Sequence, residues 1–215
     1  MFNKIFPKLH AEGYKFIVIA IISTIVFYNF SSFLGLIGLV LSIWVYYFFR
    51  DPERIIIHDD NYLVSPADGE VIKVEEVDGP KELGLESKKF NKISIFMNIF
   101  DCHVNRTPCR GQVEEILYKP GKFFNASLDK ASEDNERNYY KIKDTHGNNI
   151  VVVQIAGLVA RRIVCETNKN QELKQGERIG MIRFGSRADI YYENYEPLVK
   201  IGQRAISGET LLAKK

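Results

Sequence analysis

The chain has 215 residues, 46% of them hydrophobic, and a formal net charge of only +2. This length allows one domain with a substantial core and an additional segment. The nearly neutral charge argues against a nucleic-acid-binding protein, which needs a strongly basic surface. The three cysteines lack the spacing of a zinc site or a disulfide framework. We therefore expect no metal, and we expect Cys102, Cys109 and Cys165 to be reduced and packed as small apolar side chains.

The first predicted element is an apolar stretch near the N-terminus. Residues 16–49 contain no Asp, Glu, Lys or Arg. One membrane-spanning helix needs about 20 residues, and polar residues at 29–32 interrupt the stretch. We therefore expect two short helices, at about 14–28 and 33–49, that form a membrane-associated hairpin. A buried hairpin of a soluble protein is the alternative, whereas a cleaved signal peptide is disfavoured because no small-residue cleavage site follows.

Basic residues flank this stretch on both sides. Lysines precede it, and Arg50 and Arg54 follow it. Positive charge on both flanks predicts that both ends face the cytoplasm. We expect two domains, a hydrophobic helical hairpin over 1–50 and a second domain over 51–215 at the cytoplasmic face of the cell membrane. The hairpin could cross the bilayer or lie within one leaflet.

The second region alternates runs rich in Val, Ile, Tyr and Phe with turns that contain Gly, Pro, Asn or Asp. Such runs predict β-strands. The predicted strands lie at 69–77, 92–100, 111–118, 148–157, 161–166, 176–184 and 188–193. Glycine opens several of them, as is typical of compact β-barrels and sandwiches. We predict an α+β, mainly β fold, in which a barrel/sandwich-hybrid domain of short antiparallel strands with lipoyl-like hairpins follows the helical hairpin.

Two segments depart from this pattern. Residues 119–140 read as a long polar loop, and such loops in compact domains are usually functional or disordered. The strand-type stretch RFGSRADIYY, at 183–192, is interrupted by Gly185-Ser186. A serine hydroxyl can attack the carbonyl carbon of the residue before it, and glycine is the most permissive residue at that position. Elimination from the resulting ester cuts the chain and leaves a dehydroalanine, which hydrolyses to a pyruvoyl group.

His103 is the histidine best placed for chemistry. It directly follows a predicted apolar strand, where a sheet presents side chains to a cleft. Together with Ser186 and Asp68 it allows a serine-hydrolase interpretation. That interpretation is poorly supported, because FGSRA lacks the second glycine of the G-x-S-x-G elbow and no strand-to-helix pattern follows.

Six ordered blocks of sequence give the chain a specific resemblance. Together they resemble the short, prokaryotic-type phosphatidylserine decarboxylase proenzymes over nearly the whole chain. The blocks are FFRDPER (48–54), SPADG (65–69), FMNIFDCHVNRTPCRG (96–111), FNASLDKASEDNER (124–137), IAGLVARRIV (155–164) and RFGSRADIY (183–191).

The resemblance implies a pyruvoyl-dependent decarboxylase that converts phosphatidylserine in the membrane to phosphatidylethanolamine and CO2 in phospholipid biosynthesis. It implies self-cleavage between Gly185 and Ser186 into a β chain, 1–185, and an α chain, 186–215. The two chains would form a heterodimer, and a higher oligomer is also compatible with the family. Residue 186 would become a covalent pyruvoyl cofactor whose Schiff base with the substrate amine accepts the electrons left by CO2.

One departure from the family pattern affects the catalytic assignments. The longer bacterial members have a second histidine three residues after the first, and this chain has Arg106 there. The cleavage triad of those members therefore transfers only at Asp68 and Ser186. We expect Asp68 to support self-cleavage, with Arg106 as a residue that could orient it. We expect His103 to transfer a proton near the Schiff base.

The phosphate and carboxylate of the substrate call for cationic partners. The candidates are Arg161, Arg162, Lys122, Arg187 and Arg106. Neighbouring strand residues face opposite sides of a sheet, so Arg161 and Arg162 cannot both face one site. The alternative for one or both of Arg161 and Arg162 is a solvated surface position.

Two other functional classes stay open from the residues alone. One is a membrane-anchored, lipoyl-like adaptor or carrier domain, which fits the glycine-led hairpins but needs a lysine at a tight hairpin tip. The other is a membrane-bound serine hydrolase that uses Ser186, His103 and Asp68. Neither accounts for all six sequence blocks.

Overall fold

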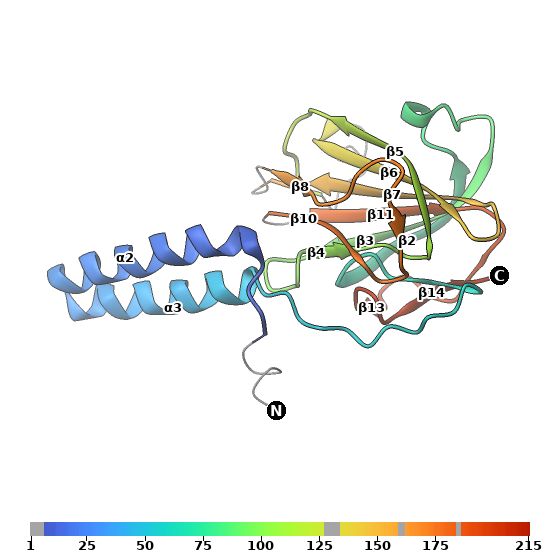
Figure 1. The fold of residues 1–215 in the computed structure, drawn as a ribbon. Coiled ribbons are helices and arrows are strands. Elements are labelled where there is room, and N and C mark those ends of the chain that lie inside the picture. Colours follow the sequence, from blue (N-terminus) through green and yellow to red (C-terminus); the bar gives the residue numbers. More distant parts are fainter. Residues whose placement is uncertain (1–6, 127–133, 159–161, 184–185) are drawn as a thin grey trace. The chain divides into compact units, whose positions relative to one another are not determined.

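A computed structural model describes residues 7–126, 134–158, 162–183 and 186–215 (Figure 1). The chain forms two compact units, Met1–Glu53 and Arg54–Lys215. In the first unit, the short 3-10 helix η1 (Ala11–Gly13) leads into α2 (Tyr14–Phe30), and α3 (Ser32–Phe48) follows. The predicted helical hairpin is thus confirmed. Ser31 separates the helices because its backbone is extended, and its side chain caps α3 by accepting a hydrogen bond from the amide of Phe33.

Small residues let α2 and α3 pack closely. A Cβ atom at Gly35 would lie 2.6 Å from the Tyr28 ring, and one at Gly38 would lie 2.8 Å from the Thr24 hydroxyl. The Thr24 hydroxyl also lies 3.0 Å from that of Ser42, which links the two helices. Close contacts and short hydroxyl bonds of this kind suit helix pairs in lipid.

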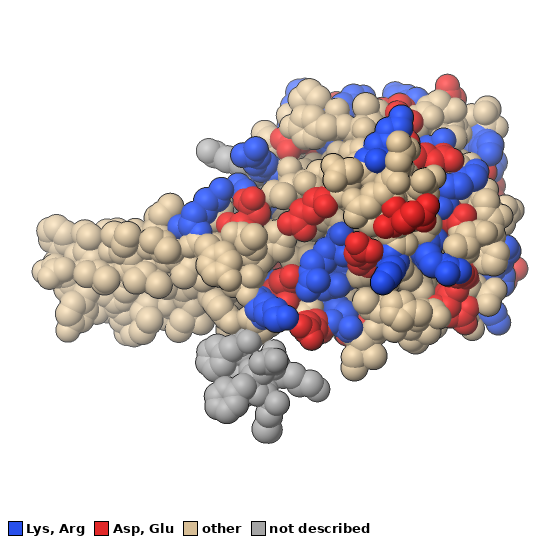
Figure 2. Space-filling model, viewed as in Figure 1, with Lys and Arg blue, Asp and Glu red and all other residues tan. Residues whose placement is uncertain are grey.

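The surface of the helical unit is apolar. The visible face of the hairpin carries no charged side chain along most of its length, whereas the second unit mixes both signs of charge (Figure 2). The helical segment Ala11–Phe30 is long and apolar enough to cross a membrane, and Ser32–Phe48 is a shorter apolar helix. These lengths are compatible with membrane association of this unit.

The second unit is built on an eight-stranded antiparallel sheet in the order β13-β2-β3-β11-β7-β6-β5-β9. The sheet twists and curls strongly (Figure 1). Its strands are β2 (Gly69–Asp78), β3 (Lys89–Met97), β5 (Gly111–Lys119), β6 (Arg137–Asp144), β7 (Asn149–Ala156), β9 (Glu172–Leu173), β11 (Ser186–Tyr192) and β13 (Arg204–Ala205). The strand β11 lies in the interior of the sheet, paired with β3 along one side and β7 along the other.

Within the described part of this unit there are also two three-stranded sheets. They have the orders β1-β14-β12 and β4-β10-β8. Their strands are β1 (Tyr62–Val64), β4 (Val104–Arg106), β8 (Ile163–Cys165), β10 (Arg178–Ile182), β12 (Glu196–Pro197) and β14 (Leu211–Lys214). Apolar side chains from both small sheets join the main core with one face of the large sheet, and the segment that follows the 3-10 helix η2 (Lys81–Leu83) packs on a second, smaller core.

The mainly β class is confirmed, and all seven predicted strands overlap observed ones. The prediction for 119–140 was wrong at its end, because β6 begins at Arg137 and enters the large sheet. Within the run 183–192, Ser186 does not interrupt a strand but is the first residue of β11, whereas Gly185 lies outside the described residues. Cys102 and Cys109 are buried as predicted, whereas Cys165 is exposed.

A buried ion pair lies on the face of β11 that is opposite to Ser186. The guanidinium of Arg187 donates to both carboxylate oxygens of Asp189 at 2.6 Å, and both side chains are almost completely buried. The ammonium of Lys92 lies 3.7 Å from the same carboxylate. Burial alone would raise the pKa of Asp189, but the charge and hydrogen bonds of Arg187, together with Lys92 and Ser94, outweigh this effect and hold that pKa below its ordinary value.

Replacing Asp189 by Asn should destabilise the fold by about 3–5 kcal/mol at pH 7, because Arg187 would stay buried without its counter-charge. Since the folded-state pKa is lowered, the pair stabilises the fold above the ordinary aspartate pKa of about 4, and this contribution disappears as the pH falls through the folded-state value. Urea unfolding in detergent at several pH values measures both effects. Asp78→Asn, which breaks an exposed pair with Lys89, is the control, and an equal loss in the two variants would contradict the prediction.

Candidate functional site

The site lies where four strands of the large sheet, β2, β3, β7 and β11, begin or end. Ser186 is the first residue of β11, and it lies opposite Met97, the last residue of β3, and Ala156, the last residue of β7. Ser186 is completely buried, and its hydroxyl lies 3.8 Å from the Met97 sulfur. The serine is therefore held between two strands at a fixed point of the sheet.

A buried polar network lies beside this serine. The side-chain amide of Asn105, on β4, donates to the Met97 sulfur at 3.8 Å, and Gln154, on β7, donates to the Asn105 oxygen at 2.9 Å. The hydroxyl of Tyr140, on β6, donates to Gln154 at 2.8 Å. Buried polar groups linked in this way rigidify their surroundings. Sequence reasoning missed this network, because its members are ordinary polar residues on separate strands.

Asn135 holds the strand end opposite Ser186. Its side-chain amide donates to the carbonyl of Ala156 at 2.7 Å and to that of Phe124 at 2.8 Å, and its oxygen accepts from the Phe124 amide at 2.8 Å. One buried side chain thus ties the segment before β6 to the end of β7.

His103 lies just before β4 and is completely buried. Its Nδ1 lies 3.0 Å from the carbonyl oxygen of Asp101. A carbonyl can only accept, so the neutral ring carries its proton on Nδ1 and has Nε2 as its basic nitrogen. The carbonyl of His103 also accepts from the amide of Ile182 at 3.2 Å, which links the histidine to the segment that leads into Ser186.

Asp68 occupies the turn between β1 and β2. The Ser65 side chain closes this turn by donating to the Ala67 carbonyl at 2.6 Å. Gly69 follows with a φ of +156°, and a Cβ atom there would lie 2.2 Å from the Phe96 carbonyl oxygen, so the close approach of β2 and β3 requires glycine. The turn thereby fixes Asp68 at the edge of the site.

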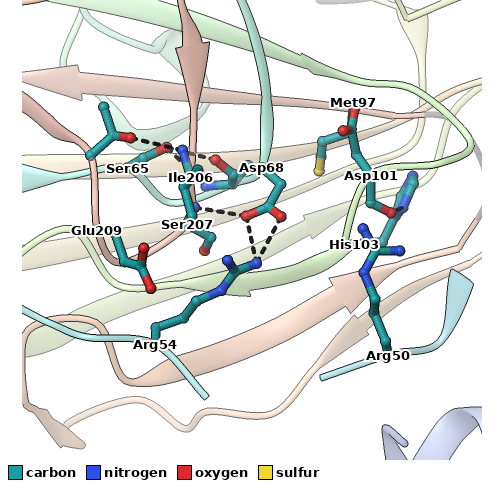
Figure 3. A network of polar contacts seen from close by, with 12 residues as sticks. Arg50, Arg54, Ser65, Asp68, Met97, Asp101, His103, Ile206, Ser207 and Glu209 are labelled. Atoms are coloured by element: carbon teal, nitrogen blue, oxygen red, sulfur yellow. Dashed lines mark hydrogen bonds and ion pairs between the residues drawn. The ribbon is translucent and has the colours of Figure 1, made fainter. Parts of the chain in front are cut away.

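Arg54 is the cation paired with Asp68. Its guanidinium donates to both carboxylate oxygens at 2.9 and 2.7 Å, and the Ser207 amide donates to one of them at 2.8 Å (Figure 3). Burial alone would lower the pKa of Arg54, but the Asp68 carboxylate raises it above its ordinary value. Arg106, which the sequence suggested as the orienting residue, donates to the Gly176 carbonyl at 3.0 Å.

Asp68 and Ser186 lie near the same end of the sheet. Glu70 pairs with Phe96 and Ser186 pairs with Met97, so two strand spacings separate the start of β2 from the start of β11. Strands lie about 4.8 Å apart, which places the two backbones about 10 Å from each other. Sequence positions 68 and 186 are thus brought close by the strand order β2-β3-β11.

The candidate substrate-binding cations are spread over different environments. Arg187 faces away from Ser186 and is paired with Asp189, because neighbouring residues of β11 point to opposite faces. The Lys122 side chain is 68% exposed and lies 3.6 Å from Asp134. Arg162 is exposed, and its carbonyl accepts from the Arg183 amide beside the His103 segment. Arg161 and Gly185 lie outside the described residues.

A surface cavity of about 660 Å³ lies elsewhere. Its lining includes Asp60, Arg110 and His146. His146 follows β6, at the end of the sheet where Ile150 pairs with Tyr192, whereas Ser186 starts β11 at the other end. The six-residue span between them corresponds to about 20 Å. This cavity is therefore separate from the serine.

Comparison with known proteins identifies the sequence group of the chain. The phosphatidylserine decarboxylase family model matches residues 41–213. A protein of Pelagibacter ubique is 79% identical over 215 residues, which cover 100% of both chains. Proteins of Ruegeria pomeroyi and Cereibacter sphaeroides are 53% and 51% identical, over 95% and 99% of this chain and 94% and 92% of theirs. All three are named phosphatidylserine decarboxylase proenzyme.

The contact between Arg54 and Asp68 should give a strong energetic coupling. In a double-mutant cycle of Arg54→Met and Asp68→Asn, the unfolding free energies should show a coupling of about 2 kcal/mol, because the pair is bidentate and largely buried. All four proteins carry Ser186→Ala, so that each of them is compared as one uncleaved chain.

The exposed pair of Arg110 and Asp60 provides the control cycle, with Arg110→Met and Asp60→Asn. Its coupling should stay below about 1 kcal/mol. Equal coupling in the two cycles would mean that Arg54 does not hold Asp68.

Proposed function

Because this chain belongs to the phosphatidylserine decarboxylase family, we propose that it converts phosphatidylserine to phosphatidylethanolamine and CO2. One structural observation carries the proposal. Ser186, the residue expected to become reactive, is the first residue of an interior strand of the sheet, with its hydroxyl buried beside the ends of β3 and β7.

The first step in this proposal is self-cleavage. The Ser186 hydroxyl adds to the carbonyl carbon of Gly185, and the peptide bond between them is replaced by an ester. Loss of the α-proton of residue 186 then breaks its Cβ–O bond, which frees the Gly185 carboxylate and leaves a dehydroalanine. Water converts the latter to a pyruvoyl group and ammonia. The name proenzyme in the relatives is consistent with such a maturation.

Asp68 supports this step in our proposal. Its carboxylate is fixed by the two hydrogen bonds from Arg54 and by the Ser207 amide, so its negative charge keeps a defined orientation near the starts of β2 and β11. A carboxylate held in this way is suited to accept or orient a proton during the cleavage. Arg54 is the positioning residue for it.

Strand pairing would keep the fragment 186–215 bound after cleavage. Seven residues of β11 pair with β3 on one side and with β7 on the other, and Ala205 pairs with Gly69. We infer that the fragments 1–185 and 186–215 remain together as a heterodimer. Residue 186 would then be held at a fixed position, as a covalent cofactor requires.

A pyruvoyl group at residue 186 would supply an electron sink for the bond that loses CO2. Two observations support such a group there: Ser186 is buried, and the carbonyl of the equally buried His103, whose basic nitrogen is Nε2, binds the Ile182 amide four residues before Ser186. We propose that His103 transfers the proton that replaces CO2 on the substrate carbon. Lys122 and Arg162 are the candidates for binding the anionic headgroup, since both carry exposed cationic side chains.

The helical unit supports a membrane location for the enzyme. The length and composition of α2, together with the uncharged stretch 16–49, support insertion into a membrane. The basic residues on both flanks support a cytoplasmic position for the second unit. This arrangement would keep the enzyme at the bilayer that contains its phospholipid substrate.

Ser186→Ala should abolish both cleavage and decarboxylation, because the variant lacks the attacking hydroxyl. Denaturing mass spectrometry should show one chain of 24.7 kDa for this variant and two fragments for the wild type. Ser87→Ala, at an exposed serine, should cleave normally. An active Ser186→Ala protein would contradict the proposed function.

His103→Ala should separate maturation from catalysis. Removing a general acid–base group typically costs about 100-fold or more in rate, so kcat should fall by at least this factor while cleavage still proceeds. Release of labelled CO2 and the fragment pattern measure the two steps. His146→Ala, distant from Ser186, is the control, and full activity of a cleaved His103→Ala enzyme would rule out this role for His103.

A further inference from the structure

We propose that four exposed apolar side chains next to Ser186 form a surface that docks the second unit on the acyl-chain region of a lipid bilayer. We call this surface the apolar rim, and its members are Ile99, Phe100, Phe124 and Leu158. The inference rests on the proposed function, since it gives the phospholipid substrate a route to residue 186.

The strand register brings the members of the rim to one end of the sheet. Ile99 and Phe100 follow Met97 on β3, and Leu158 follows Ala156 on β7. Met97 and Ala156 both pair with Ser186, from opposite sides. These two strand ends are therefore only two spacings, about 10 Å, apart.

Phe124 lies near the same end of the sheet. Its amide and its carbonyl both bind the Asn135 side chain, which also donates to the Ala156 carbonyl at 2.7 Å. A segment distant in sequence is thus tied to the strand end that precedes Leu158.

The turn after β3 is ordered and directs its apolar side chains outward. The Phe100 amide donates to the Asn98 side chain at 2.8 Å, and the Asn98 amide donates to the Asp101 carboxylate at 2.8 Å. Yet the Phe100 side chain is 69% exposed, and Ile99 is 42% exposed. Exposed apolar residues are common one at a time, but a group of them beside a reactive residue indicates a binding surface.

Charge favours a lipid surface as the occupant. The Lys122 ammonium lies 5.5 Å from the centre of the Phe124 ring and its side chain is mostly exposed. Arg162 is also exposed and follows the segment that contains Leu158. Apolar side chains flanked by cations are typical of surfaces that bind anionic membranes. The acyl chains of the phospholipid substrate lie in such a membrane, and the headgroup of the substrate must reach residue 186.

Fluorescence quenching tests the docking independently of activity. Trp44 is the only tryptophan, so Trp44→Phe provides a silent background for the full chain in phosphatidylserine-containing vesicles. The indole introduced by Phe100→Trp should be quenched by lipids brominated on their acyl chains. The indole introduced by Leu198→Trp should not be, since Leu198 lines a cavity with Asn91 and Tyr195 at the other end of β11.

Kinetics on two substrates give the second readout. Phe100→Ser combined with Leu158→Ser should raise the apparent KM for phosphatidylserine in vesicles by about tenfold or more, the factor expected from losing the burial of one large apolar side chain. The same variant should process a short-chain, monomeric phosphatidylserine within about twofold of the wild type, because that substrate needs no bilayer. Leu198→Ser should match the wild type on both substrates.

Three results would overturn the proposal. The first is an indole at position 100 that the brominated lipids do not quench, and the second is an equal loss of activity on both substrates. The third is that Phe100→Ser with Leu158→Ser abolishes self-association of the protein while the indole at position 100 stays unquenched. The last would assign the rim to a contact between protein chains. If the wild type acted on neither substrate, the proposed function would fail, whereas the quenching result would still decide whether the rim enters the bilayer.

Discussion

The pairing of β11 with β3 and β7 is the constraint on which the rest of the account depends. Ser186 begins this strand, and six further residues are held on both sides. A break immediately before Ser186 leaves that pairing intact, so the sheet can hold the new chain end as firmly as the uncut chain. Met97, Ala156 and the start of β2 lie around this end, because the neighbouring strands begin or end there.

The same constraint separates the two faces of β11. Ser186 lies on the face of the main core, next to Met97 and the polar network, whereas Arg187 lies on the other face in its pair with Asp189. The residue after Ser186 therefore stabilises the strand, and its charge is compensated by Asp189. A buried guanidinium with this geometry is costly to disturb, which gives a physical reason for a charged residue directly after the proposed cleavage position.

The sequence predicts the class of the fold well, because hydrophobic alternation and glycine turns mark most strands of the large sheet. It fails at the start of β6, because the polar loop predicted over 119–140 includes Arg137–Tyr140, although Tyr140 lies in the core. Within the site, Ser186 and Asp68 could be named from motifs. Arg54 could not be identified as the partner of Asp68, since only the tertiary fold brings the two together.

Native and denaturing mass spectrometry of one wild-type sample, prepared in detergent, test the central claim most directly. The account predicts a single complex of the full mass under native conditions, which separates on denaturation into fragments 1–185 and 186–215, the smaller with a pyruvoyl group in place of its N-terminal serine. An intact chain in an active sample would contradict it. Loss of the small fragment from an active native sample would show that β11 does not hold the cleaved end.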